Sequence, residues 1–336
     1  MGDVAMLVPV VSSLARQYPD LRITVLSRPF ARPFFENIAH NVGFMEADLK
    51  GEYHGVSGLN ALYRRLVAKN FTAIADMHNI LRSSYLRMRF NLGRYRVEHI
   101  DKHRRERRLL TSAKERELRQ IPTSFENYAD VLTRLGYPVR LDFDSVFPPS
   151  GGNLRTVSDR IGEKKMFQQW IGIAPFAAHE GKIYPPEKME LVIAEIIRRH
   201  PSCRIFLFGG GDKEMRVFDE WCSRHKNCTN ASALLGSLQQ EMTVMSHLDV
   251  MLSMDSANMH IASICGTRVV SVWGATHPFA GFMGWHQRME DAVQLDLPCR
   301  PCSIYGNRPC RRGDYACLNG ITPEMIADHV EAALRK

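Results

Sequence analysis

The stretch DVMLSMDSANMHIASICGTRVVSVWG, residues Asp249–Gly274, decides the fold. An apolar, strand-like run is followed by a short polar turn, a helix of small residues and a second apolar run. In an α/β sheet, ligands bind where the carboxyl end of a strand meets the start of a helix. The free N–H groups at such a helix start also attract phosphate. The turn carries Asp255 and Ser256, and His260 lies in the first turns of the helix, so this segment is a candidate phosphate-ligand site.

This turn has two interpretations. In the simpler one, Asp255 or Ser256 only caps the helix, and His260 is a satisfied core histidine. In the other, Asp255 holds a sugar or ribose hydroxyl while His260 faces the same opening. Other motifs of the chain favour the second interpretation.

The composition is that of a globular protein with two domains. The chain has 336 residues, of which 45% are hydrophobic and 24% charged, and this length suits two cores of ordinary size. No apolar run approaches the roughly 18–20 residues that a membrane span needs. The first apolar run follows an acidic residue, not basic ones, which is unlike a signal peptide. The sequence therefore predicts a cytoplasmic protein.

Strand-like and helical patterns alternate in both halves of the chain. In the second half, the strands are expected at 170–175, 204–208, 250–254, 269–273 and 293–297, with helices at 186–199, 213–225, 239–247 and 323–334. This alternation predicts parallel sheets covered on both faces by helices. The stretch Asp142–Lys165 breaks the pattern with Pro148-Pro149 and Gly151-Gly152 and is the expected linker. Two such domains that face each other would form a ligand-binding cleft.

The first residues lead straight into a helical pattern. A domain of this kind normally begins with a buried strand, so we expect a strand of roughly six to eight residues to be missing ahead of Met1. Gly2 and Asp3 would then form the turn at the end of that strand. Asp3 is an ordinary helix cap in one interpretation, and in the other its carboxylate accepts a proton from a hydroxyl nucleophile.

Positive charge is concentrated in the first half of the chain. Residues 1–150 hold 23 Lys and Arg against 16 Asp and Glu, whereas residues 151–336 hold 21 against 20. The segment Arg82–Arg119 alone has 13 basic and 5 acidic residues. A solvated helix explains part of this excess, and an anionic partner explains the rest. Aromatic residues that could stack on bases are sparse there, so a phosphate-bearing lipid or saccharide is favoured and nucleic acid is not expected.

Two loops of the second half carry further candidates. Lys182 lies in the polar loop APFAAHEGKIYPP, Ala174–Pro186, between the first predicted strand and helix of that half. It could neutralise a diphosphate leaving group, although a surface lysine is the alternative. Gly209-Gly210-Gly211-Asp212 follows a strand and opens a helix without matching a dinucleotide or Walker pattern. We interpret it as a tight turn in which Asp212 reaches a ribose.

Four of the eight cysteines cluster near the end of the chain. Cys299, Cys302, Cys310 and Cys317 have the spacing C-x2-C-x7-C-x6-C in a loop rich in Arg, Pro and Gly. In a cytosolic protein, this cluster favours a structural zinc site over disulfides. The second pair lacks the C-x2-C spacing, so plain thiols remain the alternative.

Together, and in order, these motifs resemble glycosyltransferase family 9, the ADP-heptose:lipopolysaccharide heptosyltransferases. Gly2-Asp3-Val4 is similar to the family's Gly-Asp-Val/Leu element, and Lys182-Ile183-Tyr184-Pro185 to its Lys-x-Trp-Pro segment. Gly210-Gly211-Asp212 resembles a Gly-x-Glu turn that contacts the donor. The six residues Asp255–His260 resemble Asp-Ser/Thr-Gly-x-x-His, the most specific of the set. The Cys299–Cys317 loop resembles the cysteine-bearing tail of many members.

Some positions depart from the family pattern. Ala257 replaces Gly and narrows the backbone approach to phosphates, and Tyr184 stands where Trp is usual. Ala177 and Ala178 replace small hydroxyl residues that often precede the lysine. The donor contacts at these positions are therefore expected to differ.

The resemblance implies a GT-B architecture, with two facing Rossmann-like domains, parallel sheets and a central cleft. It implies an acceptor domain at 1–150, a nucleotide-sugar domain at 166–320 and a terminal helix at 321–336, which could pack back on the first domain. It also implies inverting transfer of heptose from ADP-heptose to a phosphorylated lipopolysaccharide-core acceptor. The enzyme would work at the inner face of the inner membrane and would contact the anionic surface of that membrane. No cofactor would be required for the chemistry.

The resemblance assigns roles to individual residues. Asp3 would be the base and Lys182 would stabilise the departing diphosphate, while the donor would be held by Asp212, Asp255, Ser256, Ala257 and His260. Two alternatives remain: an enzyme of the same fold with another nucleotide sugar or acceptor, and a truncated, non-catalytic relative that binds glycolipid.

Overall fold

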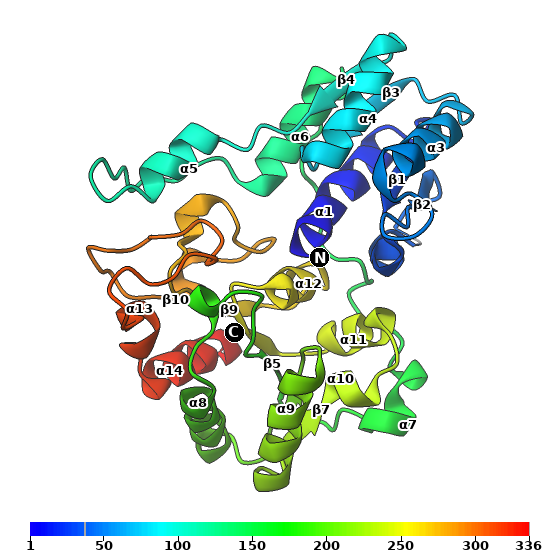
Figure 1. Ribbon diagram of the computed structural model, residues 1–336. Coiled ribbons are helices and arrows are strands. Elements are labelled where there is room, and N and C mark those ends of the chain that lie inside the picture. Colours follow the sequence, from blue (N-terminus) through cyan, green and yellow to red (C-terminus); the bar gives the residue numbers. More distant parts are fainter. Residues whose placement is uncertain (37, 336) are drawn as a thin grey trace. The chain divides into compact units, whose positions relative to one another are not determined.

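The computed structural model describes residues 1–36 and 38–335 and divides into two compact units. The first unit holds Met1, Asp3–His103 and Pro122–Asp144; the second holds Gly2, Arg104–Ile121 and Ser145–Lys336. Figure 1 labels their elements. The chain crosses between the units near residues 103, 121 and 144, so the last crossing falls inside the predicted linker.

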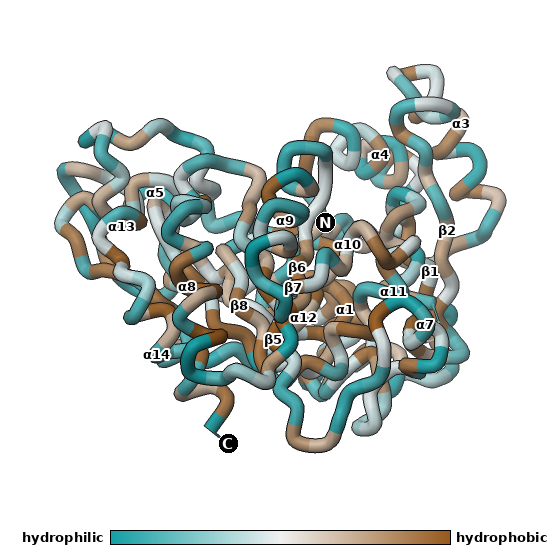
Figure 2. The backbone as a smooth tube through the Cα atoms, turned by 90° about the horizontal axis from the view of Figure 1, so that it is seen from below, coloured by the Kyte–Doolittle hydropathy of each residue, from teal (hydrophilic) through white to brown (hydrophobic). Residues whose placement is uncertain are grey.

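The second unit is built on one six-stranded parallel sheet. Its order is β10-β9-β8-β5-β6-β7, and every neighbouring pair is parallel. The strands are β5 (Trp170–Ala174), β6 (Arg204–Leu207), β7 (Cys228–Asn230), β8 (Val250–Met254), β9 (Val269–Val272) and β10 (Ala292–Val293). All residues of β5 and β8 are buried, and the tube is largely brown, hydrophobic, along these strands (Figure 2). Continuous apolar runs of this kind are what a sheet covered on both faces requires.

The strand order reverses between β5 and β8. From β5 the chain adds β6 and β7 on one side, then returns to add β8, β9 and β10 on the other. Such a reversal leaves a crevice beyond the carboxyl ends of the two central strands, where α/β proteins bind ligands. The loops that leave β5 and β8 are those that carry Lys182 and Asp255.

Helices cover this sheet. They are α7 (Ser158–Ile161), α8 (Pro186–Arg199), α9 (Asp212–Arg224), α10 (Ala231–Leu234), α11 (Leu238–Met245), α12 (Ala257–Ile264), α13 (Ala316–Asn319) and α14 (Pro323–Leu334). The terminal helix α14 packs on α8, and its apolar face enters the core of the second unit through Ile326, Ala327, Val330 and Ala333. It therefore belongs to the core of the second unit, and its packing on the first unit stays a prediction. Lys336 lies outside the described residues.

The first unit is smaller and its strands pair in twos. Parallel sheets join β1 (Ile23–Ser27) to β2 (Val42–Glu46) and β3 (Ala73–Asp76) to β4 (Arg96–His99). The helices are α1 (Gly2–Gln17), α2 (Arg32–Phe35), α3 (Gly55–Val67), α4 (Leu81–Leu92) and α6 (Ser124–Arg134). The strand expected ahead of Met1 stays a prediction.

One segment of the first half of the sequence docks on the second unit. This segment, Arg104–Ile121, begins with helix α5 (Arg104–Leu110). The Arg107 guanidinium donates to Tyr305 Oη at 2.7 Å and lies 4.8 Å from the centre of the Phe282 ring. The backbone N–H of Ile121 donates to the Phe279 carbonyl at 3.0 Å. The basic segment that the sequence placed wholly in the first domain is thus divided, because arginine stacking on aromatic rings holds α5 against the second unit.

Among the helices of the described residues, none combines the length and apolar character that a bilayer span demands.

Candidate functional site

A buried ion pair occupies the point where the strand order reverses. Lys182 Nζ, in the loop after β5, lies 2.9 Å from Asp255 Oδ2, which follows β8, and the two side chains are 15% and 3% exposed. Thr276 Oγ1 donates to the same carboxylate oxygen at 2.8 Å. Asp255 therefore caps no helix. Its desolvated charge is balanced by one cation, which is the arrangement that makes a buried carboxylate tolerable.

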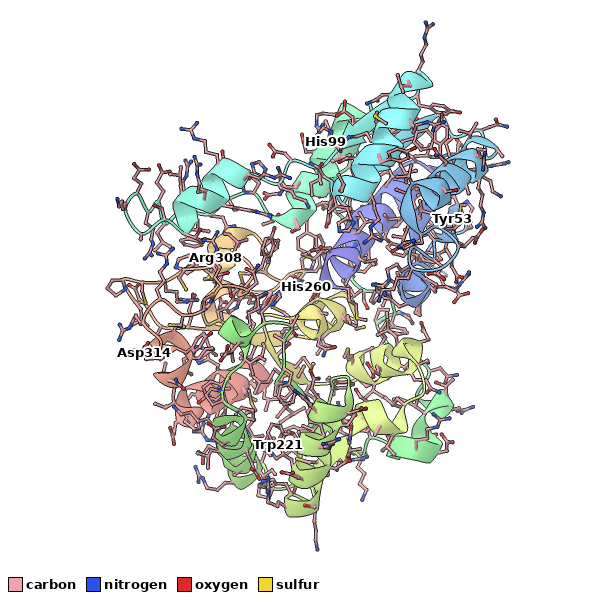
Figure 3. The ribbon with its side chains drawn as sticks, viewed as in Figure 1. Tyr53, His99, Trp221, His260, Arg308 and Asp314 are labelled. Carbon is pink, nitrogen blue, oxygen red and sulfur yellow. The ribbon has the colours of Figure 1, made fainter. Side chains whose placement is uncertain are left out.

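The start of α12 lies directly beside this pair. Ser256 is the N-cap residue in extended backbone (φ −144°), yet in the described structure its hydroxyl caps none of the helix N–H groups. Its Oγ instead lies 3.3 Å from Ser253 Oγ. The first N–H groups of α12, from Ala257 onward, are therefore left for an anion. His260, labelled in Figure 3, is buried on the same helix.

Asp212 begins helix α9 at the neighbouring strand end. The strand β6 pairs with β5, so its glycine turn lies on the same edge of the sheet as the Lys182 loop. Gly211 has φ +88°, which favours glycine,. Gly210 N–H donates to Glu214 Oε2 at 2.8 Å, and burial raises the pKa of Glu214. The carboxylate of Asp212 is exposed, and its contact with a ribose stays a prediction.

The cysteine-bearing loop packs against the Lys182 side chain. Gly306, at φ +72°, lies so close that a Cβ there would stand 2.6 Å from Lys182 Cγ. The buried Arg300 guanidinium donates to the Gly274 carbonyl at 2.6 Å, and burial lowers its pKa to about 10. The next carbonyl, that of Ala275, accepts from Cys302 N–H at 3.1 Å. Because Thr276 is the next residue and bonds Asp255, the conformation of this loop is coupled to the ion pair.

The four predicted zinc ligands line one cavity of this loop: Cys299, Cys302, Cys310 and Cys317. Burial raises the pKa of the Cys317 thiol to about 11. Across residues 1–36 and 38–335, however, no three or more His, Cys, Asp or Glu side chains are arranged as a metal site. The zinc site stays a prediction.

In the first unit, Asp3 lies in the first turn of α1 with an exposed side chain. Met1 is the N-cap residue, so Asp3 is not the helix cap. Tyr128 Oη donates to the Asp3 backbone carbonyl at 3.2 Å and ties the start of α1 to α6. The Asp3 carboxylate is therefore held in place by the helix while it remains accessible.

His78 is a residue that the sequence analysis missed. It follows β3, and burial lowers its pKa, while the nearby charge of Asp3 opposes that shift. The buried Asp76 carboxylate fixes this turn: it accepts from His78 N–H at 3.0 Å and is paired with Arg87 at 2.9 Å. The Asp-x-His pattern at the end of β3, Asp76-Met77-His78, was the available signal.

Parallel strands, an uncapped helix start and a Lys–Asp pair at a strand-order reversal are typical of an α/β protein that binds a phosphate-bearing ligand,. The profile of glycosyltransferase family 9 (heptosyltransferase) matches residues 59–310. The chain belongs to this family.

The heptosyltransferases that resemble this chain in sequence are distant relatives. Lipopolysaccharide heptosyltransferase 3 of Escherichia coli is 25% identical over 281 residues, 82% of this chain and 81% of the relative. Lipooligosaccharide heptosyltransferase 2 of Campylobacter jejuni is 24% identical over 137 residues, 39% of this chain, and the match spans only 41% of that relative's length.

Solved structures share the fold. The ADP-heptose lps heptosyltransferase II of E. coli has a TM-score of 0.67 at 16% identity, with 99% of this chain and 95% of that chain covered. A family 9 glycosyltransferase from Veillonella parvula has a TM-score of 0.73 at 19% identity, with 99% and 94% covered. The E. coli heptosyltransferase WaaC with ADP has a TM-score of 0.66 at 14% identity, with 99% and 97% covered.

The ion pair makes a specific prediction about stability and ligand binding. Lys182→Met should lower the free energy of unfolding by about 3–5 kcal/mol, because it leaves the Asp255 carboxylate buried without its cation. It should also weaken ADP binding at least about tenfold through the lost charged contact. The double variant Lys182→Met with Asp255→Asn should regain most of the stability but not the ADP affinity. Urea denaturation and calorimetric titration measure the two quantities.

The exposed Lys226→Met is the matched control and should change neither quantity. Unaltered ADP affinity in Lys182→Met would leave the lysine a purely structural role.

Proposed function

We propose that this chain transfers a heptose from ADP-heptose, with inversion, to a hydroxyl of a lipopolysaccharide-core acceptor. The Lys182–Asp255 pair at the strand-order reversal of the second unit carries this proposal. The family supports it, as do relatives described as lipopolysaccharide and lipooligosaccharide heptosyltransferases. Structures of similar fold are described with ADP and with ADP-2-deoxy-2-fluoro heptose.

The donor would bind on the second unit. Its diphosphate would meet the ammonium group of Lys182 and the N–H groups of α12 from Ser256 and Ala257 onward. Asp255, buried behind Lys182, holds that ammonium at the carboxyl edge of the sheet. His260 and Asp212 would contact the remaining phosphate and ribose groups.

In the transfer step, the acceptor oxygen forms a bond to the anomeric carbon as the bond from that carbon to the β-phosphate oxygen breaks. The proton of the acceptor hydroxyl passes to the Asp3 carboxylate. The electron pair of the broken bond leaves on ADP, where Lys182 offsets the growing charge. No cofactor takes part in these bond changes.

The acceptor would be anionic, since the first half of the chain carries the excess of basic residues. We place the enzyme at the cytoplasmic face of the inner membrane, where nucleotide sugars and a lipid-linked acceptor meet. Among the arginines of α5, Arg107 contacts Tyr305 and Phe282, whereas Arg104, Arg105 and Arg108 are exposed.

A panel of nucleotides tests the donor class. Millimolar ADP and ADP-heptose should raise the melting temperature more than UDP, GDP or their sugars, because ligand binding to the folded state stabilises it. A shift with UDP or GDP and none with ADP would replace the donor assignment with another nucleotide sugar. Binding of ADP-heptose without release of ADP in the presence of acceptor would favour a non-catalytic binding protein.

Replacement of the base tests the mechanism. Asp3→Asn should lower kcat by roughly 100- to 10,000-fold, the range typical of a lost general base, with little change in ADP affinity. Turnover is measured as ADP release, and Asp20→Asn, at an exposed position in the same unit, is the control. If the Asp3→Asn variant keeps kcat within a few-fold of the parent, the proton acceptor lies elsewhere.

We also propose a structural zinc ion for the cysteine loop, held by Cys299, Cys302, Cys310 and Cys317. Their convergence on one cavity supports this donor set,. Because the same loop packs on Lys182 through Gly306, loss of metal should lower both the melting temperature and the ADP affinity,. Elemental analysis should find about one metal ion per chain. A metal-free preparation with full stability and ADP affinity would contradict the proposal.

A further inference from the structure

Helix α4 of the first unit carries an apolar stripe on its outward face. Leu81, Met88 and Leu92 recur at intervals of seven and four residues, which places them on one side of the helix. Their exposed fractions are 89%, 49% and 76%. We call these three residues the α4 stripe. The other side of the helix is anchored in the core, where the buried Phe90 ring lies 5.0 Å from that of Tyr63.

The charged residues of helix α4 itself are all positive. The helix sequence LRSSYLRMRFNL has three arginines and no acidic residue. Arg87 is paired with Asp76 and Arg89 donates to Asn60 at 2.6 Å. Arg82 and Arg94 are exposed, and within the described part of the chain neither has a carboxylate partner. The stripe is therefore bordered by unneutralised positive charge.

We infer that the outward face of α4 rests in the headgroup region of a membrane rich in anionic phospholipid. A helix with one apolar side and a basic border is suited to lie parallel to the membrane surface. Its leucines would then face the acyl chains and its arginines the lipid phosphates. Nucleic acid would match the arginines but would leave the leucines in water. This inference deepens the proposed function, since it names the surface that brings the enzyme to a lipid-linked acceptor.

Vesicle flotation, without nucleotide or acceptor, tests the inference. The wild-type protein should float with vesicles of phosphatidylethanolamine and phosphatidylglycerol and not with phosphatidylcholine alone, and added salt should weaken binding. Serine at all three positions of the α4 stripe should lower partitioning at least about tenfold. Arg82→Ser with Arg94→Ser should reduce it as well. The matched control places serine at three exposed apolar positions of the second unit: Met166, Phe167 and Leu191.

The expected pattern is loss in the α4 variants, retention in the control triple variant, and unchanged melting temperature and ADP-dependent thermal shift in all of them. The inference fails if wild type does not float with anionic vesicles or if both triple variants lose binding equally. It also fails if wild type is a dimer that the α4 triple variant converts to a monomer, because the stripe would then face a second copy. Vesicle binding that persists while the protein shows no ADP response would refute the proposed function and leave the membrane surface standing.

Discussion

The structure of the second unit depends on keeping one carboxylate buried. Asp255 is almost fully removed from water and is held by a lysine from one loop and a threonine from another. Removing a carboxylate from water costs several kcal/mol unless a cation and hydrogen bonds offset the cost. The loops after β5, β8 and β9 must therefore take their positions together. The same arrangement holds the Lys182 ammonium at the sheet edge, where a diphosphate would share it.

The cysteine loop extends this dependence. Arg300 is a buried cation whose guanidinium is satisfied by carbonyls, including Gly274 and Leu295, and by Gln294 Oε1. A buried guanidinium without full hydrogen bonding would be costly, so these contacts fix the path of the chain from β9 into the loop. Arg308 and Asp314, labelled in Figure 3, mark its outer part. If the loop lost its ordered conformation, the position of Lys182 would change, because Gly306 packs against it. The sheet itself would not have to change.

The sequence predicted the second unit well because its strands are buried on both faces. The predicted strand at 250–254 and the helices at 186–199 and 323–334 agree with β8, α8 and α14 residue by residue. The last strand, predicted at 293–297, shares only Val293 with β10, since only Ala292–Val293 pairs with β9. In the first unit, the sequence patterns of β2 and α4 are weak, because Gly43 interrupts the strand pattern and the exposed leucines of α4 obscure its amphipathic period.

Contacts between segments that are distant in the chain could not be predicted from the sequence. Lys182 and Asp255 were each identified as candidates, but their pairing depends on the order of β5 and β8 in the sheet. Thr276 and Arg300 gave no local signal, because their roles arise only from the loops that surround them. The position of α5 could not be predicted for the same reason. Its basic residues suggested that it belongs with the first half of the chain, whereas Arg107 stacks on Phe282 of the second unit.

The two proposed partners would account for the uneven distribution of charge along the chain. A diphosphate concentrates its charge at one point, so a single lysine and the N–H groups of one helix can neutralise it within an otherwise balanced unit. An anionic membrane surface spreads its charge over an area, and each basic group near it contributes only about 1 kcal/mol. Several arginines are then needed, and they must stay free of carboxylates. Arg82 and Arg94 meet that requirement, whereas Arg87 is already paired with Asp76 and serves the turn that holds His78.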